Sequence, residues 1–208
     1  MLDAAGVATG ARKPRGEVHR DGDWHGALHI WVGGVANDGS VFALLQRRSA
    51  SKDTWPGALD VAVGGHLRAG ETLAEAAREA EEEIGLGVTL HELVRLGRRF
   101  ARSDSGTDNE VQEVFAVRSD RRLDEYRLHE DEVESVVRVP LDGARAVFEG
   151  RERAVTGLEL RRGDTVPSPA LVTADGFAAG ERGGYVALAL RGLGDVVAGR
   201  VPEPFELR

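Results

Sequence analysis

Residues 59–86 read LDVAVGGHLRAGETLAEAAREAEEEIGL, in which a glycine-rich loop joins a β-rich run to a helical pattern. The helical pattern has apolar residues at i, i+3, i+4, i+7 and i+11, which form one face of an α-helix. These residues are Leu73, Ala76, Ala77, Ala80 and Ile84. Thr72 and Glu75 have capping-box spacing, and Gly85 is a typical helix stop. The stretch therefore predicts a strand, a loop and one amphipathic helix over residues 73–84.

The same helix has an acidic face. Glu75, Glu79, Glu82 and Glu83 lie on the arc opposite the apolar one. A solvated acidic face is tolerable, because like-charged i,i+4 pairs cost only about 0.2–0.5 kcal/mol each. In an enclosed site, two carboxylates about 5 Å apart repel by about 3 kcal/mol at an effective dielectric of ~20, so a divalent cation is needed. Such oxygen ligands favour Mg²⁺ or Mn²⁺.

The loop before the helix, GGHLRAGET at 64–72, favours the second interpretation. Its glycines allow backbone groups to approach an anionic ligand at the start of a helix. Glycine turns are common, so the loop alone is a weak signal. The loop, the acidic helix and Gly85-Leu86 together are a much more specific one.

Outside this unit the chain alternates between strand and helix patterns. Strands are expected at 27–35, 41–46, 59–63, 90–96, 111–117 and 133–139, and helices at 141–148 and 183–199. Asn37-Asp38-Gly39 is a good hairpin turn between the first two strands. This mixture predicts an α/β or α+β layered domain. We expect a mobile tail at 1–15, the domain at 16–150 and a C-terminal extension at 151–208 that packs on the same domain.

Composition excludes several classes of protein. The 208 residues include 27 basic and 35 acidic ones, and the net charge of −8 argues against nucleic acid as the main partner. No cysteine is present, which excludes disulfides and a cysteine nucleophile and favours a cytoplasmic location. No apolar run of about 18 residues is available to span a membrane, and the first residues, which include Asp3, do not resemble a secretory signal.

The glycine loop and acidic helix resemble the signature of the Nudix family, G-x5-E-x7-R-E-U-x-E-E-x-G-U, in which U is aliphatic. Gly65 and Glu71 match its first half, and REAEEEIGL at 78–86 matches its second half. Six residues instead of seven separate Glu71 from Arg78, which puts the family's contact between these two in doubt. The resemblance implies an α/β/α sandwich with a mixed sheet. It also implies a pyrophosphohydrolase that uses Mg²⁺ or Mn²⁺ to cleave a small-molecule diphosphate, such as a nucleoside diphosphate linked to X.

The resemblance also implies roles for individual residues. Glu79, Glu82 and Glu83 would bind the divalent cations, and the Gly64 carbonyl would complete a metal shell. Glu79 and Glu82 would also take part in catalysis, together with Arg78, which would orient the catalytic carboxylate. The one-residue deletion leaves a second possibility open, a diphosphate-binding Nudix domain without catalysis.

The flanking segments at 17–25, 44–66 and 109–118 resemble the branch of the family that includes the isopentenyl-diphosphate isomerases. That branch implies a second metal site formed by His19, His25, His66, Asp108 and Glu110, although surface histidines are also common. Glu110 would alternatively act as a metal ligand or base of the hydrolase. Gly64 stands where the isomerases have a catalytic cysteine. Because the chain has no cysteine, we reject isomerase activity.

Several residues are left with open or structural roles. Arg47 and Arg48 follow the second strand and either clamp a substrate phosphate or are solvated strand-end residues. Trp55 and Pro56 are interpreted as packing and turn residues rather than as a base-stacking platform. His91 and His129 are expected at the surface. The extension, over 151–182, would contribute either to substrate specificity or to a homodimer contact.

Overall fold

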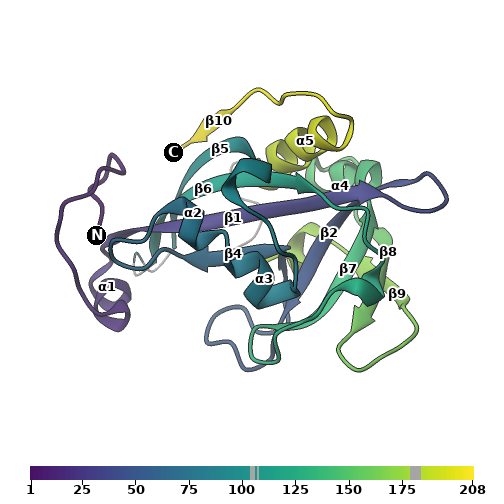
Figure 1. Ribbon diagram of the computed structural model, residues 1–208, viewed down its shortest axis with the longest axis horizontal. Coiled ribbons are helices and arrows are strands. Elements are labelled where there is room, and N and C mark those ends of the chain that lie inside the picture. The colour runs from purple at the N-terminus through teal and green to yellow at the C-terminus, as the bar shows by residue number, and fades with distance from the viewer. Residues whose placement is uncertain (104–105, 107, 179–183) are drawn as a thin grey trace.

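A computed structural model describes residues 1–103, 106, 108–178 and 184–208 (Figure 1). β1 (Trp24–Val35) runs through the centre of its sheet, between β6 (Asn109–Arg118), which is parallel to it, and β2 (Val41–Arg48), which is antiparallel. The strand order is β10-β5-β6-β1-β2-β7-β8-β9, with β3 paired to β2 and β4 paired to β1. The predicted hairpin turn joins β1 to β2, and its Gly39 has a φ of 83°. The mixed sheet that the sequence predicts is confirmed.

The remaining elements complete this order. The other strands are β3 (Leu59–Val61), β4 (Val63–His66), β5 (Val94–Arg102), β7 (Val133–Pro140), β8 (Val155–Arg161), β9 (Ser168–Val172) and β10 (Phe205–Leu207). The helices are α1 (Arg15–Asp21), α2 (Leu73–Ala76), α3 (Glu79–Ile84), α4 (Leu141–Phe148) and α5 (Tyr185–Val197), with 3-10 turns η1 (Leu90–Glu92), η2 (Leu123–Glu125) and η3 (Ala174–Gly176). Among the described residues, none of the helices has the length and apolar character to cross a membrane.

Two hydrophobic cores lie on opposite faces of the sheet. Successive residues of a strand point to opposite faces, so Trp31 joins the core with α4 and α5, whereas Ile30 joins the core with α2 and α3. In Figure 1, α4 and α5 lie together above β1, and α3 lies below it. We call these the α5 face and the α3 face. The layers are therefore helix, sheet and helix, as expected for the sandwich.

The single helix expected over residues 73–84 is instead two short helices, α2 and α3. The capping box at Thr72 and Glu75 and the left-handed stop at Gly85 are both present. Between the helices, the amides of Arg78, Ala80 and Glu81 bond to carbonyls three residues back, as in a 3-10 turn. We attribute this tight turn to the missing residue between Glu71 and Arg78. The apolar stripe survives the break, because Ala76, Ala77, Ala80 and Ile84 are all buried.

Three other segments differ from the sequence-based expectation. The strand expected at 90–96 begins with a 3-10 turn and continues as β5 to Arg102. The extension contains β8, β9 and β10 as well as a helix, and α5 runs over Tyr185–Val197, while Gly183 lies outside the described residues. At the N-terminus, residues 15–21 form α1. The preceding arm, expected to be mobile, has the Leu2 amide bonded to the Trp24 carbonyl at 2.7 Å.

The extension packs within the sheet-centred fold. β8 pairs with β7 and β9 pairs with β8, so the sheet continues into the extension without interruption. α5 buries Tyr185, Leu190 and Leu193 in the core of the α5 face. The described part of the extension therefore shares the hydrophobic core of the domain.

Candidate active site

Glu79 of α3 lies directly against the backbone of the glycine loop. A Cβ atom added to Gly65 would lie 2.9 Å from Cγ of Glu79, which is closer than side-chain contacts allow. Gly65 is in β4, opposite Leu28 of β1 and on the α3 face. A side chain at this position would therefore displace the Glu79 side chain, and glycine allows the Glu79 carboxylate to lie beside the loop.

Arg78 connects three carboxylates of this site. Its Nη1 forms an ion pair with Glu71, its Nη2 lies 2.9 Å from Oε1 of Glu79, and its Nε lies 3.1 Å from Oε1 of Glu82. The contact between Glu71 and Arg78 is thus present despite the shortened spacing. The Glu71 side chain is only 8% exposed, so its position is fixed by this pair. The predicted orienting role of Arg78 has the geometry that it requires.

Glu83 is the most buried carboxylate of the set. It is 5% exposed, and Nε2 of Gln46 donates a hydrogen bond to its Oε2 at 3.0 Å. Burial raises the pKa of Glu83 to about 8, and burial also raises the pKa of Glu79, against the influence of Arg78. Glu82 is half exposed. Buried carboxylates whose charged forms are disfavoured become stable with a cation nearby, so this donor set fits Mg²⁺ or Mn²⁺.

A second cluster lies on the α5 face. Ligand atoms of His19, His25, His66 and Asp108 are within 4.8 Å of one another. His19 comes from α1, His25 from β1 and His66 from β4, while Asp108 immediately precedes β6. The His25 ring centroid is 5.0 Å from that of His19 and 4.8 Å from that of His66. The structure therefore brings together four of the five residues proposed for a second metal site.

Several buried polar atoms of this cluster are suited to bind a metal ion. His19 Nε2, His25 Nε2 and Asp108 Oδ1 are buried, and the described residues offer them no hydrogen-bond partner. His25 Nε2 lies 3.4 Å from Asp108 Oδ1 without forming a hydrogen bond. His25 Nδ1 lies 3.0 Å from the Asp23 carbonyl, which only accepts, so Nδ1 donates, and in the neutral imidazole Nε2 then carries the lone pair. Burial lowers the pKa of His19, which favours its neutral form. These are the properties of imidazole ligands to a metal.

Glu110 lies beside this cluster and contacts it through His66. Its Oε1 is 2.7 Å from Nε2 of His66, and its Oε2 accepts a hydrogen bond of 2.7 Å from Nε2 of Gln112. Burial alone would raise the pKa of Glu110, but the hydrogen bond and charge of His66 hold it well below the ordinary value. Glu110 is thus an ionised, oriented carboxylate. Its role as a base or ligand stays a prediction.

β4 places the two clusters on either side of one strand. Gly65 faces Glu79, whereas the neighbouring His66 faces the histidines. Gly64 precedes both and pairs with His29 of β1, on the α5 face. A Cβ atom at Gly64 would lie 3.5 Å from Cγ1 of Val61 and 3.7 Å from Cδ2 of His29, which are ordinary contact distances. The Gly64 carbonyl as a metal ligand remains a prediction.

Arg47 and Arg48 are engaged with acidic residues. Arg47 Nε lies 2.6 Å from Oε1 of the buried Glu159, and Arg48 Nη1 lies 3.0 Å from Oδ2 of Asp60. Neither residue is a simple solvated strand end, since only 21% of the Arg47 side chain and 15% of the Arg48 side chain are exposed. A direct phosphate contact by either one stays a prediction. His91 and His129 are exposed, as expected.

Two polar groups near the site, one buried and one partly buried, were not singled out from the sequence. One is Gln46, which orients Glu83. The other is His29, whose Nδ1 lies 2.7 Å from the Tyr185 hydroxyl, to which Trp31 Nε1 also donates a hydrogen bond at 3.1 Å. Both stand in otherwise apolar strand runs, VFALLQ and ALHIWV. A polar residue within such a run is the signal that could have identified them.

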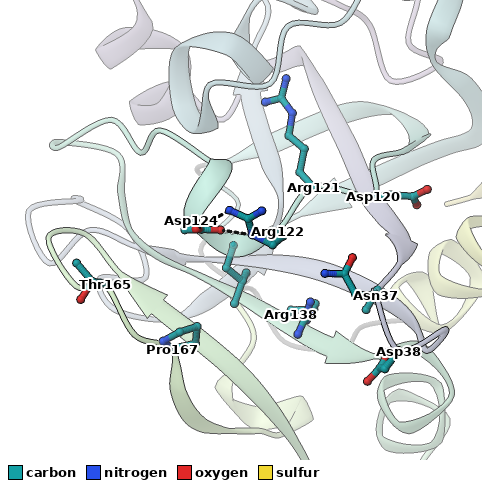
Figure 2. A pocket seen from close by; sticks show the side chains of 11 residues that line it. Asn37, Asp38, Asp120, Arg121, Arg122, Asp124, Arg138, Thr165 and Pro167 are labelled. Carbon is teal, nitrogen blue, oxygen red and sulfur yellow. Dashed lines mark hydrogen bonds and ion pairs between the residues drawn. The ribbon is translucent and has the colours of Figure 1, made fainter.

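A cavity of about 370 Å³ lies elsewhere. It is lined by Asn37, Arg121, Arg138 and Pro167, among others (Figure 2). Its lining includes no residue of either cluster. Arg122 and Asp124 at its edge form an ion pair of 2.8 Å, drawn as dashed lines in Figure 2. Volume alone therefore does not identify the candidate active site.

Comparisons with known proteins agree with this fold. The NUDIX domain family model matches residues 27–157. The chain is 38% identical to Nudix hydrolase 3 of Arabidopsis thaliana over 70% of its length, but it spans only 19% of that plant protein. It is 32% identical to an isopentenyl-diphosphate Delta-isomerase of Escherichia coli O127:H6, over 64% of this chain and 71% of the isomerase. The chain belongs to the Nudix family.

A solved structure shows a related fold. A MutT/nudix family protein from Enterococcus faecalis superimposes with a TM-score of 0.55 and 11% identity, over 91% of this chain and 68% of that chain. At this identity the likeness concerns the fold alone. It includes most of the C-terminal extension as well as the matched domain.

Proposed function

We propose that the chain hydrolyses a diphosphate linkage in a small molecule, with divalent cations held by Glu79, Glu82 and Glu83. The observation that carries this proposal is the group of α3 carboxylates, in which Glu79 lies against Gly65 of the glycine loop, Glu83 is buried and Arg78 connects Glu79 with Glu82. Mg²⁺ or Mn²⁺ bound here would neutralise charge on phosphate oxygens and lower the pKa of a bound water. Family membership supports the same reaction.

The residues of this chain supply orientation and proton transfer. Arg78 holds Glu71, Glu79 and Glu82 in one arrangement, and Gln46 holds Glu83. Glu110 is oriented by His66 and Gln112, and its lowered pKa keeps it ionised, as a base or a metal ligand has to be, while also making it a weak base. We assign Glu110 either this base role or a place in the second metal site with His19, His25, His66 and Asp108.

The two alternatives from the sequence have less support. The argument for a non-catalytic domain was the shortened signature, yet Arg78 still contacts Glu71. Isomerase chemistry needs a thiol, and the chain has Gly64 at the relevant place and no cysteine. Hydrolysis is therefore the function that the site supports best.

The test is a product-release screen with Mg²⁺ and with Mn²⁺ over nucleotide sugars, dinucleoside polyphosphates, nucleoside diphosphates and thiamine diphosphate. On a cleaved substrate, Glu82→Gln and Glu83→Gln should abolish turnover while the protein stays folded. Glu81→Gln is the matched control, since Glu81 is on the same helix but pairs with the exposed Arg127. Normal turnover in Glu82→Gln would contradict the proposal.

A further inference from the structure

The cavity in Figure 2 is formed by segments that are far apart in the chain. The β1–β2 turn contributes Asn37, and the segment that joins β6 to η2 contributes residues 120–124. The β8–β9 loop contributes Thr165 and Pro167, and Arg138 of β7 lies between the turn and the loop (Figure 2). The cavity volume of about 370 Å³ is within the range of small-molecule sites, roughly 300–1,000 Å³. The fold therefore contains a second space of ligand size, apart from the α3 carboxylates.

The three aspartates that line this cavity already have partners. The pairs are Asp38 with Ser40, Asp120 with Arg118 and Val35, and Asp124 with Arg122. The Ser40 hydroxyl donates to Oδ1 of Asp38 at 2.6 Å, and this hydrogen bond is the main reason that the pKa of Asp38 lies below its ordinary value. The charge of Arg138 makes a smaller contribution to that pKa. The carboxylates are thus ionised and hydrogen-bonded without a contact to Arg138.

Arg138 is a charge of the lining that lacks such a partner. Its guanidinium carbon lies 5.7 Å from the centroid of the Phe42 ring, and the described residues offer the group neither a hydrogen bond nor an ion pair. The Arg138 side chain is partly buried, and Phe42 is only 2% exposed. An arginine stays protonated in proteins, so its N–H groups need acceptors. Arg138 therefore presents an unused set of donors to the cavity.

The charges around the cavity favour an anion. The lining contains three arginines and three aspartates, and Arg118, the partner of Asp120, adds a fourth arginine beside it. This local excess of positive charge contrasts with the net charge of −8 of the chain. The planar guanidinium of arginine matches the geometry of carboxylate and phosphate groups. We propose that this cavity binds a small organic anion whose carboxylate or phosphate group is held by Arg138.

The rest of the lining suits an organic molecule more than a bare ion. Leu123 and Pro167 are apolar, whereas Asn37 and Thr165 supply an amide and a hydroxyl for hydrogen bonds. Such a combination of apolar surface and a few polar groups is typical of small-molecule sites. A second hollow of about 340 Å³ shares Leu123 and Thr165 with the first, so the available space continues beyond it.

The test uses phenyl phosphate and benzoate as probes, with a chelator present so that neither binds through a metal ion. Calorimetry on the full chain should show saturable binding of at least one of them. Benzyl alcohol, which has the ring without the charge, should bind about tenfold more weakly or less, because it offers Arg138 no anionic acceptor. The probe that binds more tightly identifies the anionic group as a phosphate or a carboxylate.

Three variants show whether Arg138 holds the probe. Arg138→Gln should weaken binding of the preferred probe about tenfold or more, because the charged donors are lost. Arg138→Lys keeps the charge without the planar guanidinium and should bind with intermediate affinity, and it is the second variant if the glutamine variant does not fold. Arg200→Gln is the matched control, since Arg200 is an exposed arginine that pairs with Asp195, and affinity should not change.

Chemical shifts locate the bound probe. The backbone amides of Asn37 and Thr165 should shift over the same concentration range as the calorimetric signal, and Glu82→Gln should bind the probe as the wild type does. No saturable binding of either anion, or equal affinity in the wild type and in folded Arg138→Gln, would overturn the proposal. Because the test involves neither metal nor turnover, its failure would leave the proposed hydrolase function unaffected.

Discussion

The guanidinium of Arg78 forms an ion pair with Glu71, although the chain between them is one residue shorter than in the Nudix signature. The tight turn between α2 and α3 allows this contact. The same guanidinium forms ion pairs with Glu79 and Glu82, so one arginine neutralises three neighbouring carboxylates. The shortened signature thus changes the local helix and keeps the ionic contacts.

Replacing Arg78 tests this arrangement directly. Arg78→Gln leaves the buried Glu71 carboxylate without its cation, so we expect a loss of stability on the order of 1–2 kcal/mol. Urea unfolding measures the loss, and activity on the identified substrate should fall as well. Arg127→Gln is the control, because its partner Glu81 is exposed and the expected change is below about 0.5 kcal/mol. Equal effects in the two variants would show that Arg78 is an ordinary surface cation.

Glu83 predicts how the stability of the metal-free protein depends on pH. Its pKa in the folded state is about 8, against an ordinary value of 4.5. Between these two pH values the carboxyl is ionised in the unfolded chain and protonated in the folded chain. The contribution of Glu83 to the free energy of unfolding is therefore largest below about pH 4.5. It then declines as the pH rises to about 8, by a few kcal/mol.

Glu83→Gln should remove most of that decline, because the amide has no charge to bury. Unfolding in the presence of a chelator, from pH 5 to pH 8.5, measures the slope for both proteins. Since cation binding requires the ionised carboxylate, affinity for Mg²⁺ should rise over the same range in the wild type. A wild-type slope equal to that of Glu83→Gln would contradict the buried position of this carboxylate.

If the histidine cluster binds a metal ion, the protein should retain that ion after dialysis. Wild-type protein dialysed against Mn²⁺ should keep one equivalent more than His25→Ala, because Nε2 of His25 has no other partner among the described residues. Glu82→Gln should not lower this tightly held equivalent, since Glu82 lies on the α3 face. His91→Ala serves as a control for the loss of an exposed imidazole. The same metal content in His25→Ala and wild type would exclude the cluster as a metal site.

The buried hydroxyl of Tyr185 should contribute to the free energy of unfolding. Tyr185→Phe removes the hydroxyl that Trp31 Nε1 and His29 Nδ1 both contact, so buried polar atoms lose their partner. We expect a loss of about 1–3 kcal/mol in urea unfolding. Tyr126→Phe should cost less, because the Tyr126 hydroxyl makes a single longer contact of 3.2 Å with Ser119. A loss in Tyr185→Phe no larger than in Tyr126→Phe would argue against a shared hydrogen-bonded group.

The sequence was most informative about structural features that depend on residues close together in the chain. The capping box at Thr72 and Glu75, the stop at Gly85 and the buried stripe were predicted from spacing, because each depends on neighbours three or four residues away. The break at Arg78 was not predicted. The periodicity of apolar residues is satisfied equally by one helix and by two that are joined through a tight turn.

Contacts between distant segments were harder to predict. His19 and Asp108 meet because α1 lies beside the start of β6, and only the family resemblance brought these two residues together. The β8–β9 hairpin was missed since its strands contain glycine, proline and charged residues and gain their stability by pairing with β7. The interpretation of Trp55 as a packing residue is wrong, because this residue is 55% exposed and has a positive φ of 51°, and neither property follows from its sequence neighbours.

The α3 carboxylates and the histidine cluster both depend on the four-residue strand β4. Gly65 and His66 depend on the same pairing with β1, in a register where Leu28 and Ala27 oppose them. A slip by one residue would turn each side chain to the opposite face. Local opening of this short strand would therefore disrupt both clusters together. Hydrogen exchange should then show equal protection for the amides of β4 that pair with β1.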